Sequence, residues 1–355
     1  MKAAVVGAGI MGRLLALSLI NTGYQVSIFD KHDDSGIGSC SMMAAGLLTP
    51  ITELDKSEII IYELGMVALT QHWPTILKVL EEEVYFQHTG SIVVAHPKDN
   101  AEMSHLISLI STKLKMDSVF QKLNQSTLTQ HESHLAKFNH AYYFPQEGHI
   151  DSQQMMAALK KWLYAKQIEW YQHVHVDTIR PGMIEYNQTS MKFDIVFDCR
   201  GLGAKSIFSD LYGIRGELIR LHAPDVSITR PIRFLHPRYG LYLVPRPHSI
   251  YLIGASEILS EDTRAISVRT ALELLTAAYY LHPGFAEASI LDMLTQCRPT
   301  LANHLPKVKY TDGLIAVNGL YRNGFLLAPT LVADIMQYLS RGVSSLTYPQ
   351  LWEQL

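Results

Sequence analysis

"KAAVVGAGIMGRLLALSLINTGYQVSIFD", residues Lys2–Asp30, decides the fold of this chain. The pattern predicts a buried strand, a glycine turn, a helix and a second strand that ends at the acid. In the GxGxxG spacing, the first glycine permits the tight turn and the second lets a pyrophosphate approach the backbone. The third lets the helix pack closely on the sheet, and the acid can bind a ribose. The stretch therefore predicts a dinucleotide site in a Rossmann-type domain. The residues expected at this site are Gly7, Gly9, Ile10, Met11, Gly12, Asp30 and Lys31.

Length and charge limit what the chain can be. At 355 residues it exceeds the usual size of a single core, so two domains are expected. The formal net charge of -3 gives no electrostatic reason to expect binding to nucleic acid. The apolar run at the N-terminus contains Arg13 and has no cleavage site, and no other run approaches a membrane span. We expect a cytoplasmic protein without a membrane span.

Cysteine and histidine spacing indicates neither a disulfide framework nor a metal site. The chain has three cysteines, Cys40, Cys199 and Cys297, and no CxxC pair. Its 16 histidines include no HExxH motif. We therefore predict no metal.

The glycine motif alone leaves the cofactor open, because "GAGIMG" also resembles the opening of NAD(P)-dependent beta-hydroxyacid dehydrogenases. In those proteins the rest of the chain is nearly all helical. Here strand-like stretches recur at "GSIVVA", "FDIVFDC", "GELIRLH" and "GLIAVNG", mixed with helical stretches over Gln153–Lys166 and Val268–Leu281. This alternation favours a second, sheet-rich domain that is inserted into the first.

Several spaced motifs resemble the D-amino-acid oxidase and glycine oxidase family of FAD-dependent oxidoreductases, most closely its glycine oxidase branch. They are "SCSMMAAGLLTP" (Ser39–Pro50), "GHIDSQQMMAAL" (Gly148–Leu159), "VFDCRGLGAKSI" (Val196–Ile207), "CRPT" (Cys297–Thr300) and "GLYRNGFLLAP" (Gly319–Pro329). Most are weak individually, but together their order and spacing are specific.

The resemblance implies an α/β fold with two discontinuous domains. A glutathione-reductase-like, FAD-binding Rossmann domain would take residues 1–82, 145–214 and 296–355. A substrate domain with a large mixed sheet would take residues 83–144 and 215–295.

The resemblance also implies where FAD is held. Ser39–Pro50, which resembles the second flavin-contacting segment of the family, would lie along the isoalloxazine. The strand with Val176 would meet the adenine, and the turn with Gly201 and Gly203 would close over the phosphates. A helix that opens near Pro329 would face the pyrimidine ring. Met42 and Met43 stand where covalent members carry a histidine, so noncovalent FAD is expected. The further flavin residues implied are Ala44, Ala45, Gly46, Leu47, Val176, Gly201, Gly203, Asn323, Gly324, Phe325 and Leu326.

Amine oxidation by a flavin needs an anchor that aims the substrate C–H bond at N5. A guanidinium suits a carboxylate because it binds in two-pronged fashion. Arg298 matches the family's carboxylate-binding arginine, and Tyr242 matches an aromatic that assists it. Arg322 is expected to add charge at the flavin or a second substrate contact. The simpler alternatives are a surface arginine, a half-buried sheet tyrosine and an arginine that ties the turn to a carboxylate.

These inferences predict oxidative deamination of a small amine or amino acid, with glycine or a secondary amino acid as the first candidate. One alternative is a related dehydrogenase that acts on a hydroxy acid with an acceptor other than oxygen. Another is a flavoprotein with a macromolecular substrate, such as a modified tRNA, against which the net charge of -3 weighs.

Overall fold

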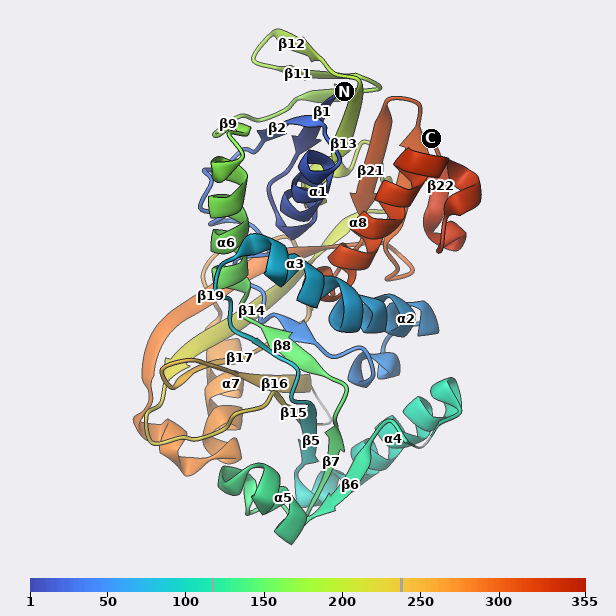
Figure 1. The fold of residues 1–355 in the computed structure, drawn as a ribbon. Coiled ribbons are helices and arrows are strands. Elements are labelled where there is room, and N and C mark those ends of the chain that lie inside the picture. Colours follow the sequence, from blue (N-terminus) through green and yellow to red (C-terminus); the bar gives the residue numbers. More distant parts are fainter. Residues whose placement is uncertain (117, 237–238) are drawn as a thin grey trace.

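Two large β-sheets with helices around them make up the protein (Figure 1). The computed structural model describes residues 1–116, 118–236 and 239–355. A seven-stranded sheet lies at the end of the molecule that holds both termini, and a nine-stranded sheet lies towards the other end. The chain is a mixed α/β protein with several sheets, as its sequence predicts.

The seven-stranded sheet has a parallel centre, in the order β9-β2-β1-β13-β21, and a β20–β22 pair at its edge. Along β1, alternate residues reach opposite faces: Ala3 and Val5 join one core cluster, and Ala4 and Val6 join another. The strands are β1 (Lys2–Val6), β2 (Gln25–Phe29), β9 (Glu169–Tyr171), β13 (Ile195–Asp198), β20 (Lys307–Thr311), β21 (Leu314–Asn318) and β22 (Trp352–Gln354).

Helices cover one face of this sheet, and a small antiparallel sheet covers the other. The glycine-turn helix is so closely packed that Leu15, Ala16 and Leu19 have no exposed surface. The helices are α1 (Ile10–Asn21), α2 (Ile59–Val67), α3 (Trp73–Leu80), α6 (Ser152–Ala165) and α8 (Gly324–Arg341). The small sheet is β10 (Thr178–Arg180), β11 (Met183–Tyr186) and β12 (Thr189–Lys192).

The nine-stranded sheet is mixed, because β5 pairs parallel with β15 while its other pairings are antiparallel. Its strands are β5 (Ser91–Ala95), β6 (Gln121–Asn124), β7 (His140–Phe144), β14 (Tyr212–His222), β15 (Ile232–His236), β16 (Tyr239–Arg246), β17 (Ile250–Gly254), β18 (Ile258–Leu259) and β19 (Ser289–Thr300). The helices α4 (Asn100–Leu114), α5 (Gln125–His131) and α7 (Val268–Leu281) lie beside it. A third, three-stranded sheet comprises β3 (Leu47–Leu48), β4 (Phe86–Gln87) and β8 (Gly148–Ile150).

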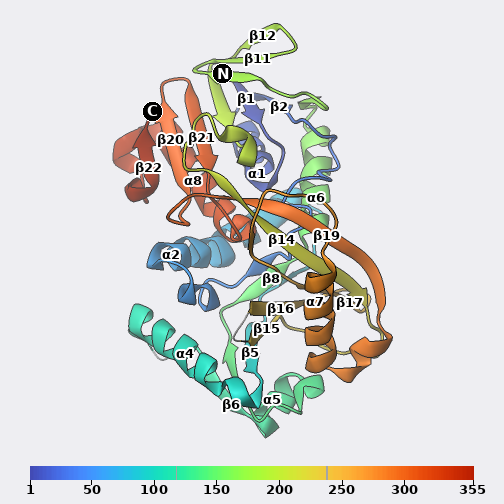
Figure 2. The ribbon, with the colours of Figure 1, turned by 180° about the vertical axis from the view of Figure 1, so that it is seen from behind.

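Two long strands connect the two ends of the molecule. β14 and β19 pair along their full lengths and cross the middle of the protein, where the seven-stranded sheet gives way to the nine-stranded one (Figure 2). These two strands form the part of the nine-stranded sheet that lies nearest the seven-stranded one. The division of the chain into two domains at the boundaries given above stays a prediction.

Two local expectations from the sequence are wrong. The last long helix begins at Gly324, so Pro329 lies inside it and not near its start. Proline has no N–H for the carbonyl of Phe325, four residues earlier; the indole Nε1–H of Trp73 donates to that oxygen instead, at 3.0 Å. The strand expected to include Val176 ends at Tyr171, and Val176 lies in the irregular segment 172–177 that follows it.

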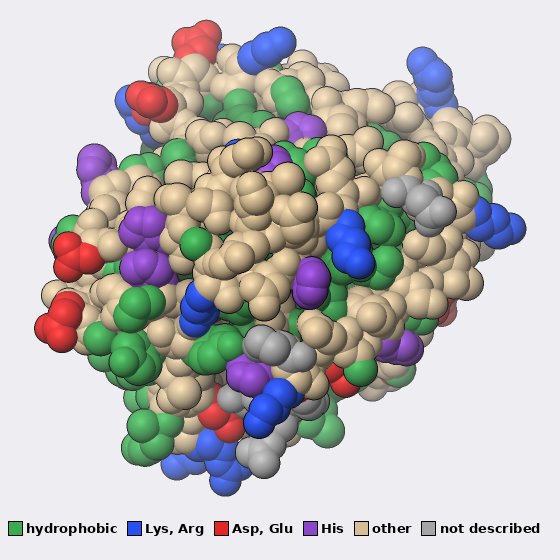
Figure 3. Space-filling model, turned by 90° about the horizontal axis from the view of Figure 1, so that it is seen from below, with side chains coloured by type: hydrophobic (Ala, Val, Ile, Leu, Met, Phe, Trp, Pro, Cys, Tyr) green, Lys and Arg blue, Asp and Glu red, His purple; other side chains and the backbone are tan. Residues whose placement is uncertain are grey.

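Figure 3 shows the end of the molecule that is farthest from the termini. Lysine and arginine side chains are scattered singly over this face among histidine, acidic and apolar side chains, and they form no continuous basic patch there. Among the described residues, no helix is both long and apolar enough to span a bilayer.

Candidate active site

A long cleft opens over the glycine turn, with about 1370 Å³ of empty volume. Its walls come from β1, the start of α1, the end of β2 and the segment after β13. Most residues predicted at the dinucleotide lie on it: Gly7, Gly9, Ile10, Met11, Asp30, Lys31, Val176, Gly201, Gly203 and Gly324. Val176 keeps this place although it lies outside a strand, because Arg200 Nη1 donates to its carbonyl oxygen at 3.1 Å.

The glycines of the turn are required by close backbone contacts. Gly7 has φ of +102°, and a Cβ there would lie 2.4 Å from the carbonyl oxygen of Cys199. A Cβ on Gly12 would lie 1.9 Å from the carbonyl oxygen of Gly7. Gly12 thus brings the helix against the turn and does not itself line the cleft. The helix N-terminus is then left pointing into the cleft, where backbone N–H groups and the helix dipole favour a phosphate.

Asp30 closes the turn as well as lining the cleft. Its Oδ2 accepts a hydrogen bond from the backbone N–H of Ala8 at 2.6 Å, and its Oδ1 accepts one from that of His32 at 2.8 Å. Each carboxylate oxygen can accept a further bond, so the side chain can hold the turn and still receive ribose hydroxyls.

A second pocket, with about 1010 Å³ of empty volume, continues from the cleft towards the nine-stranded sheet. The two cavities share six lining residues: Ile10, Cys40, Ser41, Gln296, Tyr321 and Gly324. A cleft over the glycine turn that continues into a second pocket fits the elongated shape of FAD. The residues present therefore fit that cofactor, whose adenosine would lie at Asp30 and whose ring would lie in the second pocket.

The walls of the second pocket are held by backbone contacts. Gly46 has φ of +63°, and a Cβ there would lie 1.9 Å from the carbonyl oxygen of Ile150. Arg246 is buried and donates from Nη2 to the carbonyl oxygen of Ala45 at 2.6 Å. The predicted residues that line this pocket are Ile10, Ala44, Ala45, Gly46, Leu47, Tyr242, Arg298, Arg322, Asn323, Gly324 and Phe325.

The start of α8 faces the same pocket through Asn323, Gly324 and Phe325. The first N–H that bonds within the helix is that of Leu327, which donates to the carbonyl oxygen of Asn323 at 2.8 Å. The N–H groups before it have no partner within the helix, so they form the positive end of the helix dipole. Leu326, predicted at the cofactor, is buried instead and packs on Gly65, where a Cβ would lie 2.9 Å from its side chain.

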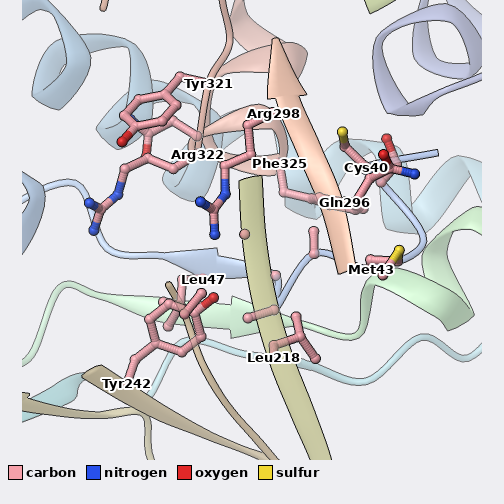
Figure 4. Close-up of a pocket in the computed structure, with 18 of the residues that line it drawn as sticks. Cys40, Met43, Leu47, Leu218, Tyr242, Gln296, Arg298, Tyr321, Arg322 and Phe325 are labelled. Atoms are coloured by element: carbon pink, nitrogen blue, oxygen red, sulfur yellow. The ribbon is translucent and has the colours of Figure 1, made fainter. Parts of the chain in front are cut away.

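Arg298 and Tyr242 point towards one another across the pocket (Figure 4). Arg298 Nη1 donates to the carbonyl oxygen of Ser256 at 3.1 Å. Its guanidinium rests on Gly216 of β14, where a Cβ would lie only 2.3 Å from Nη2. Burial raises the pKa of the Tyr242 phenol, against the opposing charge of Arg298, so the hydroxyl stays protonated and can donate a hydrogen bond.

Arg322 also points into the pocket (Figure 4), but carboxylates already surround it. Its Nε and Nη2 donate to Glu53 at 2.9 and 3.0 Å, and its Nη1 donates to Glu257. The arrangement expected as the simpler alternative, an arginine that ties the turn to a carboxylate, is therefore present. Arg322 lines the pocket in this paired state.

Several residues of this pocket are not predicted from the sequence: Cys40, Ser41, Glu53, Gly216, Leu218, Glu257, Leu294 and Gln296. Ser41 could have been found from its place in the second flavin segment; its Oγ accepts the N–H of Ile10 at 2.9 Å. No sequence signal marks the two glutamates. Desolvation raises the pKa of the Cys40 thiol to about 12, which favours the protonated thiol at neutral pH.

Comparisons with known proteins give a consistent result. A family model described as DAO, FAD dependent oxidoreductase, matches residues 2–339. A protein of Rhizobium etli that carries the name thiamine biosynthesis oxidoreductase ThiO is 32% identical over 340 residues, which is 96% of each chain. The glycine oxidase of Geobacillus kaustophilus is 26% identical over 365 residues, covering 94% of this chain and 92% of that protein.

The crystal structure of glycine oxidase from Geobacillus kaustophilus superposes with a TM-score of 0.84 at 21% identity, covering 99% of this chain and 98% of the other. This likeness confirms the predicted fold class. The family match spans nearly the whole chain and includes both the glycine turn and the α8 turn. The chain therefore belongs to the DAO family of FAD-dependent oxidoreductases.

Proposed function

We propose that this protein oxidises a small amino acid or amine with noncovalently bound FAD, in the manner of a glycine oxidase. The observation that carries the proposal is the pocket around Arg298. A guanidinium with a backbone carbonyl as its partner, beside a protonated tyrosine, suits one substrate carboxylate. The names of the relatives, ThiO and glycine oxidase, support a substrate of this class.

The roles of the chain's own residues follow from that arrangement. Arg298 binds the carboxylate through two parallel N–H donors, and the Tyr242 hydroxyl donates to the same group. The substrate α-carbon is thereby directed towards the wall formed by Ala44–Leu47. Bound FAD would supply the two-electron oxidant, so that the substrate amine is converted to an imine that water hydrolyses. The start of α8 stabilises negative charge at the opposite wall.

The residues proposed to hold the cofactor separate into two groups. The dinucleotide would be held by the glycine turn, Asp30 and Val176, and by the Gly201–Gly203 turn. The isoalloxazine would lie between the Ala44–Leu47 segment and the start of α8. We expect no covalent link, since the Cys40 thiol, which lines both cavities, is held protonated by burial.

One experiment tests the proposal directly. The purified holoenzyme is mixed without oxygen with a panel of amino acids, amines and hydroxy acids while the flavin absorbance is followed. Bleaching by glycine or an N-alkyl glycine supports the proposal. Bleaching by hydroxy acids alone, or by none of the panel, contradicts it. Acid precipitation is a separate check, because a flavin that stays with the protein contradicts the noncovalent assignment.

A further inference from the structure

The two arginines of the pocket differ in what surrounds them. Arg322 is bound by two carboxylates, from Glu53 on the short helix Thr52–Asp55 and from Glu257 after β17. Among the residues that the structure describes, no carboxylate lies within 4 Å of the Arg298 guanidinium, whose partner is the carbonyl of Ser256. The pocket therefore offers one guanidinium with a neutral partner and one that is already neutralised.

Glu257 occupies a central place in this network. One carboxylate oxygen accepts from Arg322, and the other lies 3.1 Å from Nζ of Lys56, at the outer side of the pocket. Burial opposes its ionisation, but the charges of Arg322 and Lys56 outweigh that effect and keep the pKa of Glu257 below its ordinary value. The side chain is therefore an anion at neutral pH, although it lines a ligand pocket.

The segment that carries Glu257 contacts both arginines. The carbonyl of Ser256 accepts from Arg298, and the carboxylate of the next residue accepts from Arg322. The first contact leaves Arg298 with four of its five N–H donors for a substrate. The second uses a donor of Arg322 and, with Glu53, cancels its charge. One short segment thus sets the different states of the two guanidinium groups.

We propose that Glu257 is a specificity-determining residue, which restricts the pocket to substrates that carry a single carboxylate. The inference rests on the proposed function, in which Arg298 binds that carboxylate. A second carboxylate on the substrate would find Arg322 already paired and would meet the negative charges of Glu53 and Glu257. Like charges repel, and Arg322, whose charge the two glutamates already offset, compensates less than an unpaired arginine would.

The test is the substitution Glu257→Gln. Glutamine keeps the size of the side chain and an oxygen that can accept from Arg322, but it removes one negative charge. The matched control is Glu261→Gln, which removes the same charge four residues along the chain. Glu261 pairs with Lys205 at 2.7 Å and lies outside the residues that line the pocket.

Ligand binding is measured first, without any turnover. Propionate and malonate have the same number of carbons and differ in a methyl or a second carboxylate at one end. Each is titrated into the holoenzyme while the flavin absorbance spectrum is followed. We expect wild type to bind propionate more tightly than malonate. In Glu257→Gln, malonate should bind about tenfold more tightly than in wild type, while propionate changes less than about threefold.

Turnover is measured second, with N-ethylglycine and iminodiacetate, which differ in the same way. The ratio of kcat/KM for iminodiacetate to that for N-ethylglycine should rise about tenfold in Glu257→Gln and stay constant in Glu261→Gln. If wild type binds propionate but Glu257→Gln binds malonate no more tightly than wild type does, the inference is overturned and the proposed function is not. A wild type that prefers malonate overturns it too. A wild type that binds neither acid refutes the carboxylate site, and with it the proposed function.

Discussion

Removal of the Arg298 guanidinium is the substitution that separates a substrate anchor from a structural arginine. In Arg298→Ala the FAD cleft should be intact, because the side chain contacts the second pocket and not the glycine turn. The variant should therefore retain its flavin and its Tm. It should lose the charged hydrogen bonds to the substrate carboxylate, which contribute about 1.5–3 kcal/mol each.

The magnitude follows from the donors that are free. One N–H of Arg298 is used on Ser256 O, and two of the remaining donors can pair with the carboxylate. A net loss of about 3 kcal/mol in transition-state binding corresponds to a decrease of roughly 150-fold in kcat/KM. Arg298→Lys should recover little of this, because a single ammonium cannot reproduce the two parallel donors.

Gly216→Ala gives a companion test in which the arginine is still present. The added Cβ would lie 2.3 Å from Nη2 of Arg298, so the guanidinium has to move away from β14. A displacement of about 1 Å at an anchor can cost on the order of tenfold to a hundredfold in kcat/KM. The assay is anaerobic stopped-flow reduction of the flavin at several amino-acid concentrations, with flavin content and Tm as controls. Normal reduction rates in Arg298→Ala at low substrate concentration would refute the anchor.

Three further predictions concern the pocket, the helix that faces it and the response to acid. Tyr242→Phe should lower kcat/KM by about fivefold, equivalent to one lost hydrogen bond of about 1 kcal/mol, with unchanged flavin content. Trp73→Phe should lower the urea-unfolding free energy by about 1–3 kcal/mol, because the Phe325 carbonyl loses its donor; adding Pro329→Ala, which restores the helix N–H, should recover part of it. His149 is fully buried without a partner for either ring nitrogen among the described residues, and burial, with a smaller effect of Arg246, lowers its pKa to about 3. Because the fold favours the neutral ring, the stability that this group contributes is present above the unfolded pKa of about 6.5. Wild type should lose about 2 kcal/mol of unfolding free energy between pH 6.5 and 5, as measured by urea unfolding, and His149→Phe should lose less.

The parts of the structure that the sequence predicts well are those set by local contacts. The glycine turn is one, because Gly7 has φ of +102° and a Cβ on Gly12 would meet the carbonyl oxygen of Gly7, close by in the chain. The helix over Val268–Leu281 is another, and the structure has the same bounds. In both, spacing along the chain carries the information that the fold uses.

The features that the sequence does not predict depend on contacts between residues that are far apart in the chain. Pro329 is tolerated inside α8 because an indole 252 residues away in sequence from Phe325 takes over the carbonyl that proline leaves free. Glu53 pairs with Arg322 across 269 residues, and Glu257 pairs with it across 65. A carboxylate on a short helix or a connecting loop has no spacing that would identify such a partner.

The turn that carries Arg322 explains how the two arginines come to act in one pocket. Tyr321 adopts φ of +49°, a left-handed conformation that bulky residues rarely take, and its N–H donates to the carbonyl of Pro299 at 3.1 Å. Pro299 follows Arg298 directly on β19, and Arg322 follows Tyr321. One backbone hydrogen bond between the neighbours of the two arginines therefore holds their two backbone segments side by side. A turn that only reversed the chain would have glycine at this left-handed position. Here the ring of Tyr321 lines both cavities where they meet. The strained residue therefore contributes to the site as well as to the turn.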